Sequence, residues 1–237
     1  MSHIDRFLKI ASAIGYPVTS ADVKILDFGC GSGSAVVEAR AKGLDVFGCD
    51  LSNGLGSAPK VLVERGVLRG IDMSNYRIPF ENDQFDLVAS HQVLEHVQKY
   101  EEVLREIRRV LKLGGISIHM FPSRYSPIEP HVSVPLATMI RSMNWLKIWA
   151  YLGIRNEYQN DLPARKVAEL NYQYLNTSTN YLTKRELRHH FSKSFPFVLF
   201  VEKEYLAAGN GYGPLIAKLP VVPSLFGAFL SRVVACA

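Results

Sequence analysis

The sequence predicts an α/β fold built on a doubly wound, mostly parallel sheet. Two observations carry this prediction. The first 120 residues alternate between short, β-rich apolar runs and helical patterns, and the first such run ends in a glycine-rich turn that opens a helix. A chain of 237 residues accommodates one domain of this kind with a modest elaboration. Its 48% apolar and 21% charged residues are ordinary globular usage, so wholesale disorder is excluded.

The elements of the first half follow from the spacing of apolar residues. Helical spacing predicts helices at 4–14, 34–41, 61–65 and 100–111. Gly15 and Gly66 end the first and third of these helices, and Gly114 and Gly115 separate the fourth from the next strand. Apolar, β-rich runs predict strands at 24–28, 44–49, 68–71, 85–90 and 116–121.

The pattern changes after Pro122, where prolines punctuate a loop before a long aromatic-rich stretch. We interpret residues 123–180 as a helical insertion that forms a lid over the carboxyl ends of the strands, within a single domain of residues 1–237. Thr183 and Glu186 then have the spacing of a capping box, which predicts a helix over 183–191. Further helices are expected at about 136–152 and 164–175, and a strand at 195–205.

The glycine-rich turn after the first strand is the strongest site-forming feature. In Asp27-Phe28-Gly29-Cys30-Gly31-Ser32-Gly33, the glycines let a ligand lie against the backbone, where a Cβ would hold it off. Such a loop lies at the carboxyl edge of the sheet, where open α/β folds bind ligands. Asp50, at the tip of the second strand, is placed to accept both hydroxyls of a ribose, and capping the next segment is its alternative role.

Six motifs in order resemble those of class I S-adenosylmethionine-dependent methyltransferases. The glycine turn is similar to the first motif of that family, and Phe47-Gly48-Cys49-Asp50-Leu51-Ser52 is similar to its second-strand motif. The other motifs lie at 70–73, 78–80 with 85–88, 93–97 and 109–115. The resemblance covers residues 20–122 and extends to the subgroup of ubiquinone/menaquinone-type and sugar or natural-product methyltransferases. It implies a Rossmann-like, seven-stranded sheet and S-adenosyl-L-methionine as the cofactor.

The resemblance also implies a role for each residue of the cofactor site. The glycine turn would approach the methionyl moiety, with Asp27 near its ammonium group, and Asp50 would hold the ribose. Asp72 would accept from the adenine amino group while Met73 packs on the ring, and the end of the fourth strand would face the sulfonium and the incoming nucleophile. The full expected set is Asp27, Phe28, Gly29, Cys30, Gly31, Gly33, Asp50, Leu51, Asp72, Met73, Ser90 and His91.

The expected acceptor is a small molecule that is methylated on oxygen. Nitrogen and carbon are the alternative accepting atoms. Methyl transfer is an in-line displacement, so the enzyme must mainly align and desolvate the nucleophile. A hydroxyl acceptor usually also needs a base, for which His131 is the first candidate and His91 the second. A hydrogen-bonded structural histidine is the alternative for each.

The remaining polar pair near the fourth strand is given a structural role. Glu95 and His96 are expected to shape the segment after that strand. No metal site is expected, because His91 and His96 lie five residues apart with no third ligand at helical spacing.

Two other classes of function are weighed against this one. A non-catalytic module that binds the cofactor is disfavoured by the intact glycines together with Asp50 and Asp72. A nicotinamide-dependent oxidoreductase is disfavoured because the turn reads Gly-x-Gly-x-Gly, not Gly-x-Gly-x-x-Gly, and because no Tyr-x-x-x-Lys motif is present.

The charge distribution and the cysteine content limit which partners and which cellular compartment are expected. The net charge is +5, but the basic residues of the second half are scattered, so no nucleic-acid partner is expected. The apolar tail at 213–237 is expected to pack internally and to end in a short antiparallel strand at 232–235, with peripheral membrane contact or a homodimer as the alternatives. Three widely spaced cysteines and a charged N-terminal segment favour a cytoplasmic location, peripheral to a membrane if the tail is an anchor.

Overall fold

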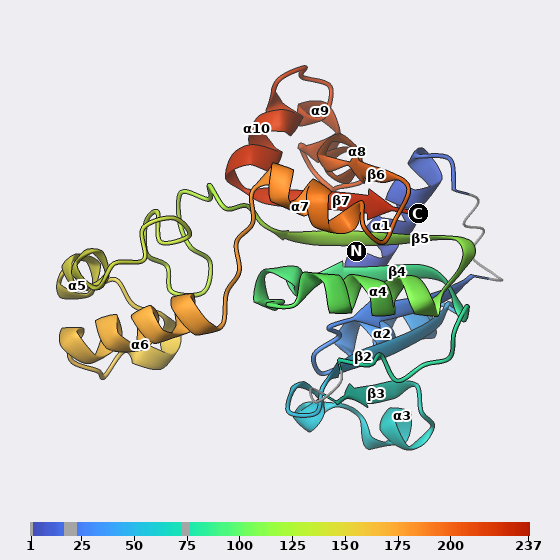
Figure 1. The fold of residues 1–237 in the computed structure, drawn as a ribbon, viewed down its shortest axis with the longest axis horizontal. Helices are drawn as coiled ribbons and strands as arrows, with labels where there is room; N and C mark the ends of the chain where they lie inside the picture. Colours follow the sequence, from blue (N-terminus) through green and yellow to red (C-terminus); the bar gives the residue numbers. More distant parts are fainter. Residues whose placement is uncertain (1, 17–22, 73–75) are drawn as a thin grey trace.

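The computed structural model describes residues 2–16, 23–72 and 76–237 (Figure 1). These residues form one seven-stranded sheet in the order β3-β2-β1-β4-β5-β7-β6. Neighbouring strands from β3 to β5 are parallel, and β7 is antiparallel to both β5 and β6. The strands are β1 (Lys24–Phe28), β2 (Asp45–Leu51), β3 (Leu68–Ile71), β4 (Phe85–His91), β5 (Leu111–Pro122), β6 (Val198–Phe200) and β7 (Ser231–Cys236). The predicted Rossmann-like fold is confirmed.

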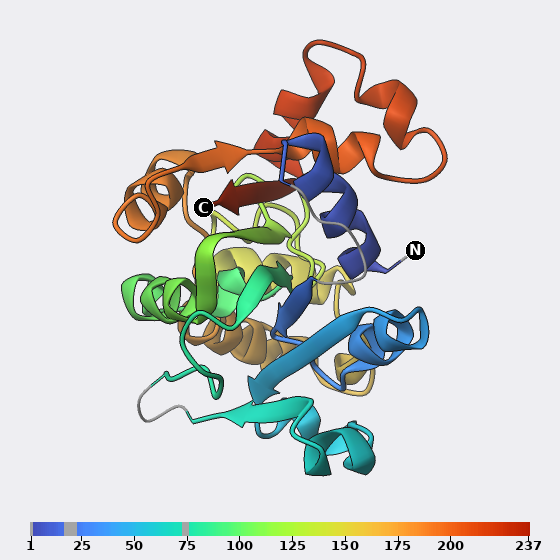
Figure 2. The same cartoon turned by 90° about the vertical axis from the view of Figure 1, so that its right-hand side faces the viewer.

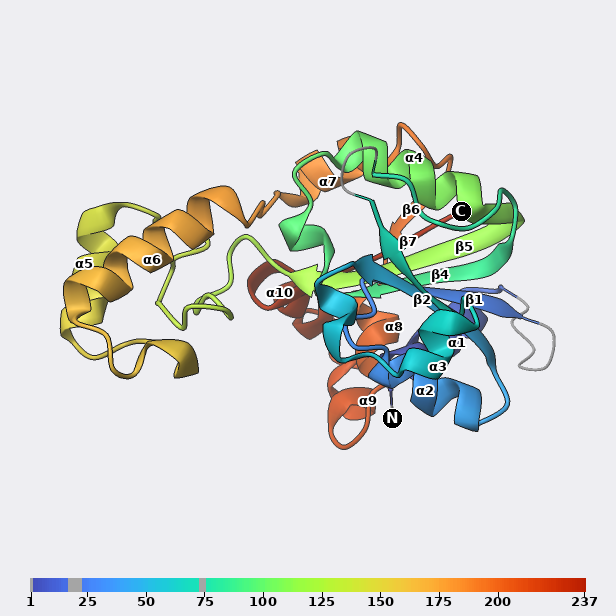
Figure 3. The ribbon, with the colours of Figure 1, turned by 90° about the horizontal axis from the view of Figure 1, so that it is seen from below.

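Helices cover both faces of the sheet (Figures 2 and 3). On one face α4 (Tyr100–Val110) and α7 (Lys184–Phe191) bury an apolar cluster that includes Leu104, Ile107 and Phe191. On the other face the main helices are α1 (His3–Ala13), α2 (Ser34–Ala41) and α8 (Glu202–Ala207), and α3 (Lys60–Glu64) flanks the β3 edge. Because both faces are covered, the central strands read as nearly continuous apolar runs.

Residues 123–180 form a lobe that projects beyond the carboxyl end of β5 (Figures 1 and 3). Its helices are α5 (Met143–Tyr151) and α6 (Ala164–Thr177), with a short turn of 3₁₀ helix at η3 (Glu157–Gln159). The lobe has its own apolar cluster, formed by Val132, Val134, Ala137, Leu146, Ala150, Val167, Ala168 and Leu175. Two hydrogen bonds donated by Asn180 join the end of the lobe to the segment after β4. The backbone amide of Asn180 donates to the Glu95 carbonyl at 2.6 Å, and its side-chain amide donates to the Val97 carbonyl at 3.0 Å.

Two predicted elements of the second half are wrong in extent. The helix expected at 136–152 begins only at Met143, because Ser142 is its N-cap and Leu136 has a left-handed φ of 55°. The strand expected at 195–205 is limited to Val198–Phe200, after which the chain turns into α8. Gly114 and Gly115 do not separate the fourth helix from the next strand, as was expected: they lie within β5, at an irregularity where pairing passes from Phe85↔Leu111 to Leu87↔Ile116.

The C-terminal segment is partly internal and partly exposed. β7 lies between β5 and β6 and is buried, which confirms the strand expected at 232–235. Arg232 there forms a buried ion pair with Glu202 of α8 at 3.3 Å. The helices α9 (Gly213–Ile216) and α10 (Val222–Phe229) and the residues that flank them leave large apolar side chains about half exposed or more: Leu215, Leu219, Val221, Leu225, Phe229 and Leu230. Within the described residues, no helix is both long and apolar enough to cross a membrane.

Candidate functional site

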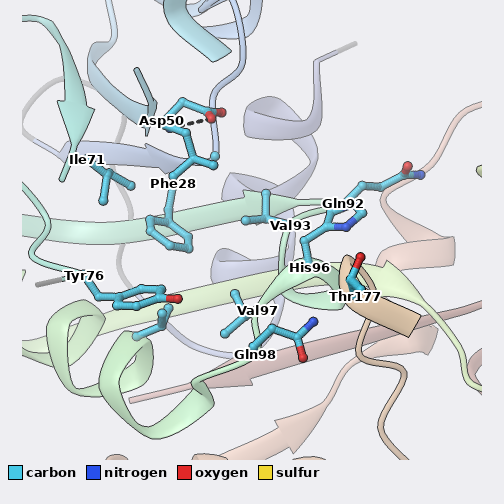
Figure 4. A pocket seen from close by; sticks show the side chains of 13 residues that line it. Phe28, Asp50, Ile71, Tyr76, Gln92, Val93, His96, Val97, Gln98 and Thr177 are labelled. Carbon is cyan, nitrogen blue, oxygen red and sulfur yellow. Dashed lines mark hydrogen bonds between the residues drawn. The ribbon is translucent and has the colours of Figure 1, made fainter. Parts of the chain in front are cut away.

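A cavity of about 440 Å³ opens at the carboxyl ends of β1, β2, β3 and β4 (Figure 4). Asp50 lies at one end of this pocket, and His96 and Thr177 lie at the other. Open α/β sheets bind ligands at this edge, because the strands end there and the loops diverge. The pocket is lined by Phe28, Gly29, Asp50, Leu51, Ile71, Tyr76, Gln92, Val93, His96, Val97, Gln98, Val103 and Thr177.

The glycine turn closes one wall of the pocket and has a specific need for glycine. Gly29 has a φ of +80°, and a Cβ on it would lie 2.2 Å from Val93 Cγ2. Gly33, at the N-cap of α2, has a φ of +78°, and a Cβ there would lie 2.6 Å from Leu68. Gly31 also has a positive φ, but no atom of the described residues lies within 4 Å of its Cβ position. The turn is therefore packed tightly behind Gly29 and Gly33, and it is open beside Gly31.

Asp50 is held at the tip of β2 by two backbone amides. The amide of Gly31 donates to its Oδ2 and the amide of Leu51 donates to its Oδ1, each at 2.6 Å. An ionised carboxylate has further lone pairs to accept other donors, and Asp50 reaches the pocket surface. The geometry is suited to a ligand that brings hydroxyl groups to this corner.

Asp27 lies behind the turn and is not part of the pocket lining. It is 1% exposed, and its Oδ1 lies 2.9 Å from His3 Nε2 of α1, a contact that sequence reasoning missed. Burial lowers the pKa of His3, but the hydrogen bond and the charge of Asp27 outweigh it, and the net pKa is raised. His91 stacks on His3 with ring centroids 5.3 Å apart, and burial, followed by the nearby His3, lowers the pKa of His91 to about 4.

The end of β4 does not present two adjacent residues to one ligand. Successive side chains of a strand point to opposite faces, so Ser90 and His91 diverge. Ser90 is fully buried, its hydroxyl lies 2.7 Å from His119 Nδ1 on β5, and it is not among the residues that line the pocket; its contact with the cofactor stays a prediction. His91 lies on the α1 side, outside the pocket lining.

Among the described residues, Cys30 and Asp72 are expected cofactor residues that do not line the pocket. Cys30 is partly buried behind the turn, and a Cβ on Gly48 would lie 2.8 Å from its Sγ. Asp72 follows the pocket residue Ile71 and forms an isolated bridge with Arg77. Met73 lies outside the described residues.

His131 belongs to a buried polar network at the base of the lobe. Glu129 is fully buried, and its carboxylate accepts from the His131 and Val132 amides, at 2.8 and 2.7 Å, and from the Tyr181 hydroxyl at 2.5 Å. His131 Nδ1 lies 2.8 Å from Glu129 Oε1. Burial opposes the charged form of each group, but their mutual hydrogen bond outweighs it, so the pKa of Glu129 is lowered and that of His131 is raised.

His131 meets Glu95 and His96 from the other side of the same junction. The His96 and His131 ring centroids are 4.9 Å apart, and Glu95 Oε1 lies 4.0 Å from His96 Nε2. Glu95 is fully buried, and burial raises its pKa to about 7. The expectation of no metal ligand rested on His91 and His96 alone. The structure brings His131 from the lobe to this cluster instead.

A second cavity of about 510 Å³ lies on the lobe side of the cluster. Its lining includes His131, Tyr174, Asn156 and Asn171. His96 lines the first cavity and His131 lines the second, so the two cavities adjoin at this pair of rings.

Sequence reasoning missed most of the far wall of the first pocket, which comes from residues just after β4 and from the end of α6. The available signal was the position of 92–98 directly after a strand. No comparable signal pointed to Thr177 or Tyr181, because only the folded lobe brings them to this junction.

The sheet order, the glycine turn and a pocket at the carboxyl edge define a ligand-binding α/β domain of the Rossmann-like class. Residues 26–119 match the family model described as a methyltransferase domain. The demethylmenaquinone methyltransferase of Bacillus velezensis is 35% identical over 98 residues, which cover 39% of this chain and 42% of that protein. The ubiquinone biosynthesis O-methyltransferase of Pseudomonas entomophila is 33% identical over 105 residues, which cover 41% of this chain and 44% of that protein.

A solved structure of a geranyl diphosphate methyltransferase in complex with GPP and sinefungin shares the fold, with a TM-score of 0.52 at 17% identity. The match covers 99% of this chain and 77% of that one. Residues 26–119 thus match a methyltransferase domain, and the resemblance that the motifs predicted is confirmed over that segment. The matched segment spans less than half the length of the curated relatives.

Proposed function

We propose that this chain transfers a methyl group from S-adenosyl-L-methionine to a hydroxyl oxygen of a small molecule. The observation that carries the proposal is the pocket at the carboxyl edge, with an acidic side chain at one end and the His96–His131 junction at the other. Relatives named as quinone methyltransferases support a small-molecule acceptor, and one named as an O-methyltransferase supports oxygen.

The proposed binding mode places the ribose at Asp50 and the methionyl end along the backbone of the glycine turn. Asp50 accepts the ribose hydroxyls while keeping its amide bonds. Phe28 and Ile71 provide apolar contact within the pocket. The methyl group then points toward His96, the end of the pocket that adjoins the lobe.

The lobe at 123–180 is proposed to act as the lid and to hold the acceptor in the second cavity. Bound S-adenosyl-L-methionine would supply an electrophilic methyl group: the acceptor oxygen would bond to the methyl carbon as the carbon–sulfur bond breaks, and the electron pair of that bond would stay on sulfur to give S-adenosylhomocysteine. The hydroxyl proton passes to His131 Nε2, since Glu129 occupies Nδ1. His91 stays the second candidate base, but its pKa of about 4 makes it a weak one at neutral pH.

Calorimetry with S-adenosylhomocysteine tests the cofactor site. Asp50→Ala should weaken binding by about 1.5–3 kcal/mol, roughly ten- to a hundredfold in Kd, the range for hydrogen bonds to a charged group. Asp45→Ala is the matched control, because it removes an exposed carboxylate from the other end of the same strand. Equal affinities for both variants and the wild type would remove Asp50 from the site.

A turnover assay separates this proposal from its alternatives. A mass shift of 14 Da on a small hydroxylated acceptor is the expected readout; tight cofactor binding with no transfer to any acceptor would favour a non-catalytic module. Binding of a nicotinamide cofactor in preference to S-adenosylhomocysteine would favour an oxidoreductase.

The exposed apolar side chains of α9 and α10 are proposed to contact a membrane surface or a second copy, and three free cysteines support a reducing, cytoplasmic location. Sedimentation with anionic liposomes and measurement of the oligomeric state distinguish these partners.

A further inference from the structure

The junction between β4 and the lobe carries an inference that goes beyond methyl transfer. We propose that Glu95, His96 and His131 form a binding site for a divalent cation of the zinc type. One potential ligand atom of each residue lies within 4.8 Å of those of the other two. Glu95 and His96 come from the short 3₁₀ helix η2 (Leu94–His96), and His131 comes from the base of the lobe.

Both imidazoles are oriented as metal ligands are. His96 Nδ1 lies 2.8 Å from the carbonyl of Ser178, which only accepts, so Nδ1 carries the proton. His131 Nδ1 faces the Glu129 carboxylate in the same way. In each neutral ring this leaves the lone pair on Nε2. Metal-bound histidines are held by this pattern, with the second ring nitrogen donating to a carbonyl or a carboxylate.

Among the described residues, the buried carboxylate of Glu95 has no hydrogen-bond partner, and this observation points to a bound ligand. Its side chain is 0% exposed, and neither carboxylate oxygen has a hydrogen-bond partner within the described part of the chain. An ionised Glu95 is then a buried charge without compensation, and a protonated one leaves its hydroxyl without an acceptor. A cation between Glu95 and the two imidazoles satisfies the carboxylate in one step.

Glu129, the other buried carboxylate here, is already satisfied and is therefore an orienting group and not a fourth ligand. Four bonds reach it, from the His131 amide and ring, the Val132 amide and the Tyr181 hydroxyl. It fixes the ring of His131 in place while Glu95 stays unpaired.

The donor set selects the class of cation. Two imidazoles and one carboxylate match the three protein ligands of zinc sites that keep a position open, whereas Mg²⁺ and Ca²⁺ favour oxygen ligands throughout. Ligands at about 2.1 Å on a tetrahedral ion lie about 3.4 Å apart, so side-chain shifts on the order of 1 Å close the site.

The position gives the cation a place in the site already described. His96 lines the cofactor pocket and His131 lines the second cavity, so the open coordination position would face the boundary between them. A cation there competes with the proposed proton transfer for His131 Nε2. Its binding is measured without cofactor or acceptor, so it stands or falls apart from methyl transfer.

Titration of the chelator-treated full chain with Zn²⁺, and with Co²⁺ as a spectroscopic probe, tests the inference. We expect one Zn²⁺ per chain and Co²⁺ visible bands typical of a site with fewer than six ligands. Glu95→Gln and His131→Ala should each weaken Zn²⁺ binding at least a hundredfold, and Glu129→Gln, which loosens the orienting bond, should weaken it ten- to a hundredfold.

His189→Ala is the matched control, because His189 is an exposed histidine of α7 beside another histidine and outside the cluster. Its Zn²⁺ affinity should equal that of the wild type. Unchanged Zn²⁺ and Co²⁺ binding in folded Glu95→Gln and His131→Ala, or loss of binding in His189→Ala alone, would overturn the proposal. Because Gln is nearly isosteric with Glu, a melting curve like that of the wild type is expected for Glu95→Gln.

Discussion

The Gly29→Ala substitution probes the tight contact between the glycine turn and the segment after β4. Its backbone φ of +80° costs an alanine about 1–2 kcal/mol. The new Cβ would also lie 2.2 Å from Val93 Cγ2, an overpacking that costs about 1–3 kcal/mol more as the neighbours shift. The expected loss of unfolding free energy is therefore about 2–5 kcal/mol. Because Gly29 and Val93 both line the pocket, cofactor-product binding should weaken as well.

Urea denaturation of four variants, Gly29→Ala, Gly43→Ala, Val93→Ala and the double variant Gly29→Ala/Val93→Ala, separates the two costs. Gly43→Ala has the same backbone strain, with a φ of +83°, but within the described part of the chain no atom lies within 4 Å of its Cβ position, so it should lose only about 1–2 kcal/mol. In the double variant Gly29→Ala/Val93→Ala, the loss should be smaller than the sum of the two single losses by about 1–3 kcal/mol. A Gly29→Ala loss no greater than that of Gly43→Ala, or strictly additive effects in the double variant, would refute the contact.

Two further predictions concern buried charge pairs. Glu202→Ala leaves Arg232 buried without its partner and should cost about 3–5 kcal/mol in urea denaturation; a cost below about 1 kcal/mol would mean that the pair does not form. The raised pKa of His3 beside Asp27 stabilises the fold fully below the ordinary His value near 6.5, and this contribution is lost as pH rises through the raised folded value. The melting temperature of the wild type should therefore exceed that of His3→Gln most at pH 6 and least at pH 9, and a gap that grows with pH would contradict the pairing.

The first half of the fold was readable because each local signal agreed with the global arrangement. Only one interpretation fits each of three segments: the apolar run at 24–28, the turn that follows it and the apolar stripe of α4. The structure places the bounds of β1 and α4 within one or two residues of the prediction. The pocket corner at Gly29 and Asp50 was readable for the same reason, since the end of a parallel strand fixes where its last side chain lies.

The second half misled where local patterns compete. The apolar run at 195–201 passes directly into a helix, and periodicity alone does not say where the strand ends. Ser142 was an available N-cap signal for α5. The apolar residues before it also fit a helical pattern, so the predicted helix began too early. The turn of Leu136 into left-handed backbone had no signature in the sequence, because large aliphatic residues rarely adopt it.

The polar junction was beyond sequence reasoning for a different reason. Glu95 and His96 are separated from His131 by more than thirty residues, and only the folded lobe brings them together. Ser90 and His91 leave β4 on opposite faces, and neither lines the pocket, so strand alternation alone did not reveal which of them a ligand would meet.

The most direct test of the account is a crystal structure of the chain with bound S-adenosylhomocysteine. We expect its ribose hydroxyls within hydrogen-bonding distance of the Asp50 carboxylate, its amino-acid end along Gly29 to Gly31, and its sulfur directed toward His96. A ligand bound in the second cavity or on the lobe, with the Asp50 corner free, would contradict the central claim that the carboxyl edge of the sheet is the cofactor site.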